Sequence, residues 1–367
     1  MTDAQQKQPK HVMMMAAGTG GHVFPALAVA KQLQQQGIQV SWLATPVGME
    51  NRLLKNHNIP IYQINIQGVR GNGLIRKLAA PFKILGATLS AMRYMKQLKV
   101  DAVAGFGGYV AGPGGLAARA LGIPVLIHEQ NAVAGFTNTQ LSRVAKTVCQ
   151  AFPNTFPNSD KIVTTGNPVR EEITATLSPA WRYQEREKAG LPIRILIVGG
   201  SLGAQALNEC VPEALKQLNV ALDVYHQCGQ NHADATQARY AHKPDHLQVE
   251  VQSFIEDMAK AYSDADLIIC RAGALTVTEV ATAGVAAVFV PLPSAVDDHQ
   301  TANAKFLADL GAAKICPQAS MNPESLTTLL TPLMNRQLLS EMAVKARQQA
   351  QPDATQHVVR LIQALFE

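Results

Sequence analysis

The chain is 367 residues long, enough for about two domains that each bury a full core. Its composition, 47% hydrophobic and 16% charged, excludes an intrinsically disordered protein. The formal charge of +5 hides an asymmetry. Residues 1–167 carry 16 Lys and Arg against 5 Asp and Glu, a net of +11, and the remainder carries 16 against 22, a net of −6. The basic half favours an anionic partner such as nucleic acid, a phospholipid surface or a phosphorylated substrate.

Several sequence features narrow the choice of anionic partner and of cellular location. Aromatic residues make up only 5% of the chain, and no zinc-finger or RNP motif occurs, so we do not expect nucleic acid as a partner. The five cysteines are scattered without a C-x-x-C pair, as is typical of the reducing cytoplasm. The first eleven residues lack the apolar core of a signal peptide, and glycines or prolines interrupt the two longest uncharged runs. We therefore expect a protein that stays inside the cell and does not span a membrane.

Taken in chain order, the first half alternates short apolar runs with helical patterns. We predict strands at 11–15, 40–44, 61–66, 102–105 and 125–127, and helices at 26–36, 49–56 and 114–121. Such alternation predicts a parallel sheet that is covered on both faces. Ligands bind beyond the carboxyl ends of the strands in such sheets, where the loops 18–22, 105–113 and 128–131 lie.

A second alternating series begins at residue 194, after a border at 166–170 (GNPVR). We predict strands at 195–198, 223–227, 247–251, 267–270 and 287–290, helices at 207–217, 258–261 and 275–283, and a helical tail at 337–350 and 355–366. The sequence therefore predicts an α/β protein of two similar, doubly wound domains. We place the N-terminal domain at 1–168 and the C-terminal domain at 169–345, with residues 346–367 packing back onto the first.

The stretch 74–99 differs from the rest because its apolar residues are surrounded by basic ones. The apolar positions that fall roughly on one helical face are Leu74, Ile75, Leu78, Phe82 and Leu85. We expect Pro81 to break or kink this helix. One interpretation is a connecting helix with its apolar side in the core. The other is a basic amphipathic patch that lies in a membrane interface.

Three glycine-rich turns each follow an apolar run, at 18–22 (GTGGH), 199–204 (GGSLGA) and 271–279 (RAGALTVTE). Glycine lets the backbone approach a ligand closely, and the N–H groups at the start of the following helix face an anion. The third turn is the best-formed candidate for binding a diphosphate without a metal. Glu279, about one turn into its helix, could accept both hydroxyls of a ribose or could be an ordinary acid near a helix start.

The sequence lacks the common nucleotide-binding motifs, and its acidic clusters are poor candidates for metal sites. Neither G-x-G-x-x-G nor G-x-x-x-x-G-K-[ST] occurs. Asp264 and Asp266 match the D-x-D of some metal-dependent sugar-nucleotide enzymes, but they stand directly before an apolar strand, where a solvated turn is the favoured interpretation. Asp297, Asp298 and His299 are adjacent in sequence and rarely share a face. We therefore expect neither a metal site nor a cofactor.

Eight motifs together resemble those of a known family. In order they are GTGGHVFP, GFGGYVAGP, HEQN, GNPVR, GGSLGA, SFIEDM, RAGALTVTE and DDHQTANA, and they cover nearly the whole chain. This pattern is similar to the MurG family, the UDP-N-acetylglucosamine:lipid I N-acetylglucosaminyltransferases of bacterial peptidoglycan synthesis. The resemblance implies a GT-B fold, with two Rossmann-like domains facing a cleft, and no required metal. It also implies an inverting transfer of GlcNAc to the C4 hydroxyl of lipid I, which gives lipid II.

The same resemblance implies partners and a location. The partners are UDP-GlcNAc, lipid I, the anionic surface of the inner membrane and other cell-wall synthesis proteins. The location is the cytoplasmic face of the bacterial inner membrane, with the protein bound peripherally. An enzyme of this family serves cell-wall biogenesis and, through it, cell shape and division.

The resemblance also assigns donor-site residues. Ser201 and the helix start at 274–276 resemble diphosphate binders, Glu279 resembles the acid that holds the ribose, and Ile255 resembles the main-chain group that reads uracil. Asn131 and Arg170 match positions that complete the nucleotide-sugar site, and Gln300 matches a sugar contact. The predicted UDP-GlcNAc-binding set is Thr19, Gly20, Gly21, Asn131, Arg170, Ser201, Ile255, Ala274, Leu275, Thr276, Val277, Thr278, Glu279 and Gln300. The family commonly has Gln-Gln where this chain has His299-Gln300, so the resemblance carries over only the second of those sugar contacts.

An inverting transfer needs a base for the acceptor hydroxyl and positive potential for the departing diphosphate. We predict His22 as the base, and its alternative role is to bind the acceptor diphosphate or brace its loop. Glu129 is the second candidate, although HEQN could instead only shape the cleft. Gly107, Gly108 and Tyr109 suit the acceptor diphosphate.

Two rival functions stay open at this point. One is a UDP-GlcNAc 2-epimerase on the same fold, which needs no lipid. The other is a membrane-bound adaptor that has kept an inactive sugar-nucleotide fold. The basic half argues against the first, and the intact loop residues Thr19, His22 and Gln300 argue against the second.

Overall fold

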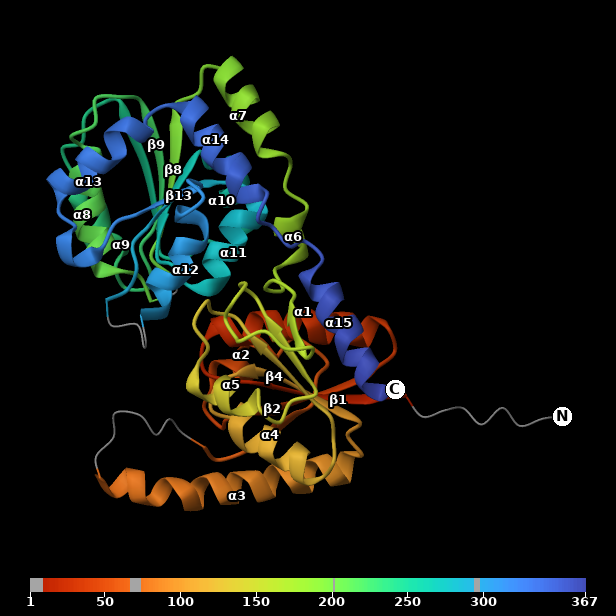
Figure 1. Cartoon of the computed structure of the whole chain (residues 1–367). Helices are drawn as coiled ribbons and strands as arrows, with labels where there is room; N and C mark the ends of the chain where they lie inside the picture. Colours follow the sequence, from red (N-terminus) through yellow and green to blue (C-terminus); the bar gives the residue numbers. More distant parts are fainter. Residues whose placement is uncertain (1–8, 67–73, 201, 294–297) are drawn as a thin grey trace. The chain divides into compact units, whose positions relative to one another are not determined.

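The computed structural model describes residues 9–66, 74–200, 202–293 and 298–367, in two units (Figure 1). The N-terminal unit comprises the chain up to Val169 together with Pro352–Glu367, and the C-terminal unit comprises Arg170–Gln351. Within the described ranges, no helix combines the length and apolar content that crossing a membrane requires.

In the described part of the N-terminal unit, seven parallel strands form one sheet in the order β3-β2-β1-β4-β5-β6-β7. The strands are β1 (His11–Ala16), β2 (Gln39–Ala44), β3 (Ile61–Gln63), β4 (Ala102–Gly107), β5 (Val125–Glu129), β6 (Thr147–Gln150) and β7 (Ile162–Thr164). The winding direction reverses between β1 and β4. Loops that follow these two strands therefore meet at the carboxyl edge, where ligands bind in such sheets.

Helices cover both faces of this sheet (Figure 1). They are α1 (Gly20–Gln35), α2 (Met49–Leu53), α3 (Leu74–Leu98), α4 (Ala111–Ala120), α5 (Phe136–Leu141) and α15 (Ala354–Gln363), followed by the 3-10 turn η4 (Ala364–Phe366). Alternate residues of β1 face opposite sides, so Met14 packs in the core under α1 and α15, whereas Met13 and Met15 pack under α3 and α4. Because helices bury both faces of the sheet, every side chain of β1 is buried, and β1 reads as a continuous apolar run.

The C-terminal unit repeats the design. In its described residues, six parallel strands follow the order β10-β9-β8-β11-β12-β13. They are β8 (Ile193–Val198), β9 (Leu222–Gln227), β10 (Leu247–Gln252), β11 (Leu267–Cys270), β12 (Ala286–Phe289) and β13 (Ala313–Ile315). The direction reverses between β8 and β11, which places the loops after these two strands side by side.

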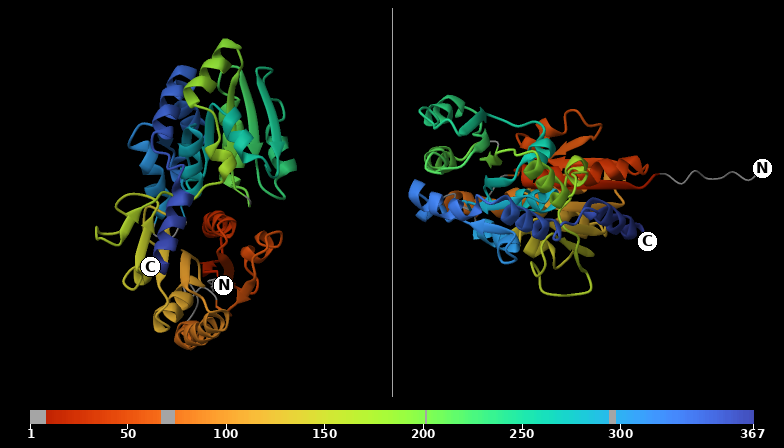
Figure 2. Two further views of the ribbon diagram at one scale, coloured as in Figure 1. Left: turned by 90° about the vertical axis from the view of Figure 1, so that its right-hand side faces the viewer. Right: turned by 90° about the horizontal axis from the view of Figure 1, so that it is seen from above.

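The helices of this unit again lie on both faces of the sheet. They are α6 (Glu171–Thr174), α7 (Pro179–Lys188), α8 (Gln205–Leu215), α9 (Ala233–Arg239), α10 (Met258–Asp264), α11 (Ala274–Ala283), α12 (His299–Ala308), α13 (Pro323–Leu330) and α14 (Arg336–Arg347), with 3-10 turns η2 (Gln318–Ser320) and η3 (Thr331–Leu333). Figures 1 and 2 show α14, coloured blue, beside α7, coloured lime. The tail predicted as helical is thus divided between the units, α14 belonging to the second and α15 to the first.

Two helices differ from the sequence-based expectation at a proline. The first begins at Gly20 rather than at 26, because Thr19 is extended and serves as its N-cap, and Pro25 lies inside it. Of the two outcomes predicted for Pro81, a break of the helix is wrong, since α3 runs through that residue from 74 to 98. Proline removes one intrahelical hydrogen bond. In α3 the later turns stay helical because Ala87, Ala91 and Met95 are buried against the sheet and α4.

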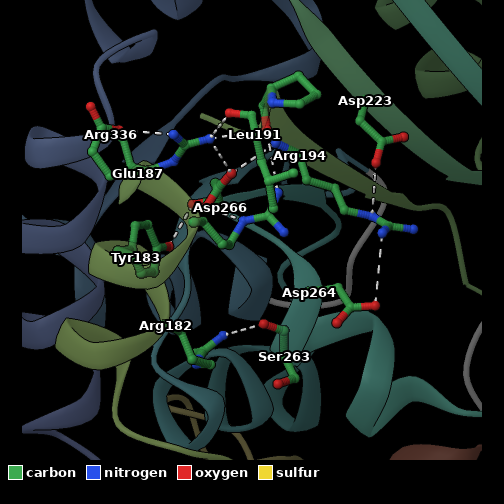
Figure 3. A network of polar contacts seen from close by, with 12 residues as sticks. Arg182, Tyr183, Glu187, Leu191, Arg194, Asp223, Ser263, Asp264, Asp266 and Arg336 are labelled. Carbon is green, nitrogen blue, oxygen red and sulfur yellow. Dashed lines mark hydrogen bonds and ion pairs between the residues drawn. The ribbon is translucent and has the colours of Figure 1, made fainter. Parts of the chain in front are cut away.

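The prediction that Asp266 is solvated is also wrong. Its carboxylate is fully buried and accepts hydrogen bonds from Arg186 Nε (3.0 Å), the Arg194 backbone N–H (2.8 Å) and Arg336 Nη2 (3.4 Å). Figure 3 shows Asp266 between Arg336 and Arg194, with Tyr183 donating to its carbonyl at 2.6 Å. Two cations on α7 and α14 therefore neutralise this carboxylate and tie both helices to β11.

Candidate functional site

The first glycine turn links β1 to α1 in the N-terminal unit. Gly18 has φ 97°, a conformation that favours glycine, and its N–H donates to Glu50 Oε2 at 3.3 Å. Glu50 is fully buried, and its other oxygen accepts from the backbone N–H and the hydroxyl of Thr45, both at 2.9 Å. Glu50 thus braces the loop from α2. Sequence reasoning missed this role, because an acid in a short helix carries no signal of a contact 32 positions away.

His22 lies in the first turn of α1, where its ring is held by the same loop. Its Nδ1 lies 3.3 Å from the Ala17 carbonyl oxygen and 3.5 Å from Thr19 Oγ1. A carbonyl oxygen only accepts, so this contact favours the tautomer with a proton on Nδ1. In that neutral tautomer the lone pair is on Nε2, which is the atom that could take a proton.

The loop after β4 packs against the loop that holds His22. A Cβ added to Gly107 would come within 2.8 Å of His22 Cδ2, and one added to Gly108 would collide with the Ala17 carbonyl. Both glycines have positive φ, 104° and 78°. Tyr109, which follows them, is 54% exposed. The structure therefore brings the predicted base and the predicted acceptor loop together at the carboxyl ends of β1 and β4.

Glu129, the second candidate base, is occupied by its own loop. This buried carboxylate accepts from the Asn131 backbone N–H (3.0 Å), Asn131 Nδ2 (3.1 Å), the Gly135 N–H (3.1 Å) and Asn138 Nδ2 (2.8 Å). Four donors fill the roughly four lone-pair sites of a carboxylate. Asn131 is accordingly fixed by Glu129, and the geometry favours a loop-shaping role for HEQN.

His128, one residue earlier, is a buried neutral group. Its Nε2 lies 2.9 Å from the Gly166 carbonyl oxygen, and its Nδ1 lies 3.2 Å from Gln130 Nε2. Burial away from water lowers the pKa of His128 from 6.5 to about 4. This histidine therefore connects the HEQN loop to the start of GNPVR without carrying charge at neutral pH.

In the C-terminal unit, the turn after β11 leads into α11, whose N-cap is Gly273. Within the predicted run 274–279, the side chains of Ala274, Val277 and Thr278 are buried, which leaves Leu275, Thr276 and Glu279 partly exposed. The buried members can meet a ligand only through the backbone. Gln300 Oε1 accepts from the N–H groups of Ala272 (3.3 Å) and Leu292 (2.9 Å), so its amide NH₂ is the end that can donate to a sugar.

Glu279 is held at both oxygens. Oε1 accepts from Arg170 Nη2 at 3.0 Å, and Oε2 accepts from the Tyr262 hydroxyl at 3.0 Å. The structure thus brings together the two predicted residues Arg170 and Glu279. Tyr262, a buried residue of α10, was not predicted, since its position in an apolar helical pattern indicates only core packing.

The loop after β10 carries Ile255, whose side chain is 4% exposed. It borders a hollow of about 490 Å³ lined by Arg194, Tyr225, Glu250, Gln252, Phe254, Ile255, Glu256, Asp257, Lys260, Ala261 and Asp264. A second hollow, of about 380 Å³, is lined by Arg170, Glu172, Ile173, Glu256, Asp257, Met258 and Ala259. Glu256 and Asp257, which follow Ile255, therefore lie beside Arg170.

The glycine turn after β8 is held by a glutamine. Buried Gln227 accepts from the Gly200 N–H at 3.1 Å and donates to the carbonyls of Gly200 (2.9 Å) and Ser253 (3.0 Å). It joins this turn to the loop that carries Ile255, a role that sequence reasoning missed. Ser201 lies outside the described residues. In the described part of the chain, no group of three or more His, Cys, Asp or Glu could hold a metal ion.

Comparison with known proteins identifies the family. The models of the glycosyltransferase family 28 N-terminal and C-terminal domains match residues 12–150 and 194–358. A protein of Acinetobacter baumannii (strain SDF) is 82% identical over 365 residues and covers all of both chains. It is named UDP-N-acetylglucosamine--N-acetylmuramyl-(pentapeptide) pyrophosphoryl-undecaprenol N-acetylglucosamine transferase. The crystal structure of Acinetobacter baumannii MurG is 79% identical, covers 97% of this chain and 100% of that chain, and has a TM-score of 0.87. The chain belongs to the MurG family.

A more distant relative supports the same family, and a distant solved structure supports the fold alone. The Psychrobacter cryohalolentis protein with the same transferase name is 50% identical and covers 96% of this chain and 98% of its own. The calicheamicin glycosyltransferase CalG4 shares only the fold, at 14% identity, with a TM-score of 0.69 over 98% of each chain. The predicted resemblance to the MurG family and the α/β, GT-B class with two doubly wound parallel sheets are confirmed.

Proposed function

We propose that the chain transfers GlcNAc from UDP-GlcNAc to the C4 hydroxyl of MurNAc-(pentapeptide)-pyrophosphoryl-undecaprenol, lipid I, to form lipid II. The observation that carries the proposal is the 82% identity, over the full length of both chains, to proteins named for this transfer. The relatives with this name give no support to the 2-epimerase alternative.

The C-terminal unit would bind the donor. Its anionic diphosphate would face the N–H groups at the start of α11, where the helix dipole is positive. Glu279 would accept hydroxyls of the ribose, beside Arg170 and the main chain at Ile255 that would meet uracil. Ser201 would add a diphosphate contact, and Gln300 would donate to the sugar through its amide.

The N-terminal unit would present the acceptor. The C4 hydroxyl would give its proton to Nε2 of His22 as its oxygen bonds to C1 of GlcNAc. The bond from C1 to the diphosphate oxygen breaks, and its electron pair leaves with UDP. This role is supported by the contact of Nδ1 with the Ala17 carbonyl, which favours a lone pair on Nε2. Thr19, Gly20 and Gly21 would close over donor and acceptor, and Gly107, Gly108 and Tyr109 would meet the acceptor diphosphate.

We also propose that α3 lies against the cytoplasmic face of the membrane. Phe82, Leu85 and Leu89 are 78%, 57% and 57% exposed and recur at the spacing of one helix face. Arg93 and Lys96 continue that face and are exposed. Apolar side chains followed by basic ones suit an anionic lipid interface. The side chains of Leu74, Ile75 and Leu78, which were predicted to share the patch, lie outside the described ones.

A transfer assay tests the function. Full-length protein should move radiolabelled GlcNAc from UDP-GlcNAc to a lipid I analogue and release one UDP per sugar transferred. Without the acceptor, UDP-GlcNAc should remain unchanged. Conversion to the 2-epimer in that arm would establish the epimerase instead, and no reaction in either arm would contradict both enzymatic functions.

A further inference from the structure

The two partners of the Glu279 carboxylate differ in kind. Arg170, which donates to Oε1, has a side chain that is 42% exposed. Tyr262, which donates to Oε2, is only 1% exposed. Exposed ion pairs are screened by water and restrain their partners weakly. A buried hydroxyl has no water to exchange with, so its hydrogen bond persists.

Tyr262 is itself held firmly. It lies in α10, which packs against α11, the helix of Glu279. Its backbone carbonyl accepts from Arg182 Nη1 at 3.3 Å, and that guanidinium also donates to the carbonyls of Ser263, Ala283 and Gly284. Arg182 therefore connects the ends of α10 and α11. The hydroxyl that reaches Glu279 is fixed relative to the helix on which Glu279 stands.

The hydroxyl stays a donor over the whole working range of pH. Burial, together with the neighbouring Glu279 carboxylate, raises the pKa of Tyr262 well above its ordinary value of 10. In its contact with a carboxylate oxygen that carries no hydrogen, a protonated phenol is the donor.

The last torsion of a glutamate side chain is broad, so a carboxylate with only mobile partners rotates freely. Each carboxylate oxygen has two lone-pair sites, and Tyr262 takes one on Oε2. We propose that Tyr262 is a positioning residue for donor binding, and that its hydroxyl sets the plane of the Glu279 carboxylate so that the remaining lone pairs accept the ribose hydroxyls. The proposal rests on the function proposed above.

The test compares UDP with 2′,3′-dideoxy-UDP, which lacks both hydroxyls that Glu279 would accept. For full-length Tyr262→Phe, we expect calorimetry to give about tenfold weaker UDP binding, the effect of losing one ribose hydrogen bond to the charged Glu279 carboxylate when that carboxylate is no longer held in place. Binding of 2′,3′-dideoxy-UDP should change by less than about twofold. The matched control is Tyr240→Phe, because Tyr240 is 3% exposed and its hydroxyl, among the residues that the structure describes, bonds His226 at 2.9 Å and no residue of the proposed donor site.

A second variant separates positioning from general damage. In a Glu279→Gln background, adding Tyr262→Phe should weaken UDP binding much less than it does in the wild type. The reason is that Tyr262 acts on UDP through the Glu279 carboxylate, which the first substitution has already removed. The proposal would be overturned if Tyr262→Phe weakened UDP binding equally in both backgrounds. It would also be overturned if Tyr262→Phe kept the wild-type preference for UDP over 2′,3′-dideoxy-UDP, or if Tyr240→Phe weakened UDP binding as much. A wild-type protein with no preference for UDP over its dideoxy form would instead contradict the proposed ribose contact of Glu279, and so the donor site itself.

Discussion

The two units build a glycine turn at the same place in the same kind of sheet, yet brace it with different chemistry. In the N-terminal unit the braces are carboxylates, Glu50 on Gly18 and Glu129 on the loop that follows β5. In the C-terminal unit they are neutral amides, Gln227 on Gly200 and Gln300 on Ala272. An uncompensated buried carboxylate beside a diphosphate would repel it, whereas an amide braces the loop without charge. Neutral braces therefore fit the proposed donor side. On the N-terminal side, where the acceptor diphosphate is proposed, the Glu50 carboxylate instead accepts hydrogen bonds from Gly18 and Thr45.

The largest expected effect concerns the imidazole of His22, which lies at the N-terminal glycine turn. His22→Ala should lower kcat about 10²- to 10⁴-fold, the usual contribution of a general base. UDP affinity, measured by calorimetry, should stay within about twofold, since the residues proposed to hold the uracil, ribose and diphosphate of UDP lie mainly in the other unit. The matched control is His57→Ala in the same unit, which should leave both quantities unchanged. Turnover near the wild-type value in His22→Ala would remove His22 as the base and leave the function standing.

The pH dependence of stability gives the next largest effect. Burial lowers the pKa of His128 to about 4, below the 6.5 of an unfolded histidine. Between these values the unfolded chain binds more protons, so the N-terminal unit loses stability as pH falls from 6.5 towards 4. By pH 5 the loss from His128 is about 2 kcal/mol. His128→Asn should lower stability at pH 7.5 but remove this part of the pH slope.

The two tryptophans allow this slope to be measured in one unit. Trp42 is buried in the N-terminal unit and Trp181 lies in α7 of the other, so Trp181→Phe leaves Trp42 as the sole tryptophan, whose fluorescence can be excited selectively. Urea unfolding of that variant at pH 7.5 and pH 5 gives the slope. The control is His226→Asn, because burial lowers the pKa of His226 to about 3 in the C-terminal unit. A Trp42 slope that changes with His226→Asn but not with His128→Asn would contradict the assignment.

Two isosteric substitutions, one in each unit, test directly whether the charge of the bracing side chain matters. Gln227→Glu places a charge beside Gly200 and removes two donors, and Glu50→Gln removes the charge beside Gly18. Each swap leaves buried groups unpaired and should lower the free energy of unfolding by about 1–3 kcal/mol. Gln227→Glu alone should weaken UDP binding, by about tenfold, whereas Glu50→Gln should lower kcat alone. Equal effects of both swaps on UDP affinity would mean that charge does not distinguish the two turns.

The sequence predicts the sheets well because buried parallel strands are marked by their own residues. Strands β1 and β11 read as apolar runs that end at a glycine turn, and their helices follow at once. The braces are different. Gln227 and Tyr262 act on residues 27 and 17 positions away, and nothing local marks such a pairing. Asp266 looks solvated for the same reason, since its cations lie 80 and 70 positions away in α7 and α14.

The smallest expected effect tests whether the proposed membrane contact belongs to one unit. Replacing Phe82 and Leu85 by serine should weaken binding to vesicles with anionic lipid by about fivefold, because apolar burial in the interface is lost. Stability should change by less than about 0.5 kcal/mol, since both side chains are exposed. The control is Trp181→Ser, an apolar side chain 52% exposed in the C-terminal unit. If Trp181→Ser released the protein from vesicles as strongly, the contact would not be specific to α3. The asymmetry of charge between the halves would then need another explanation.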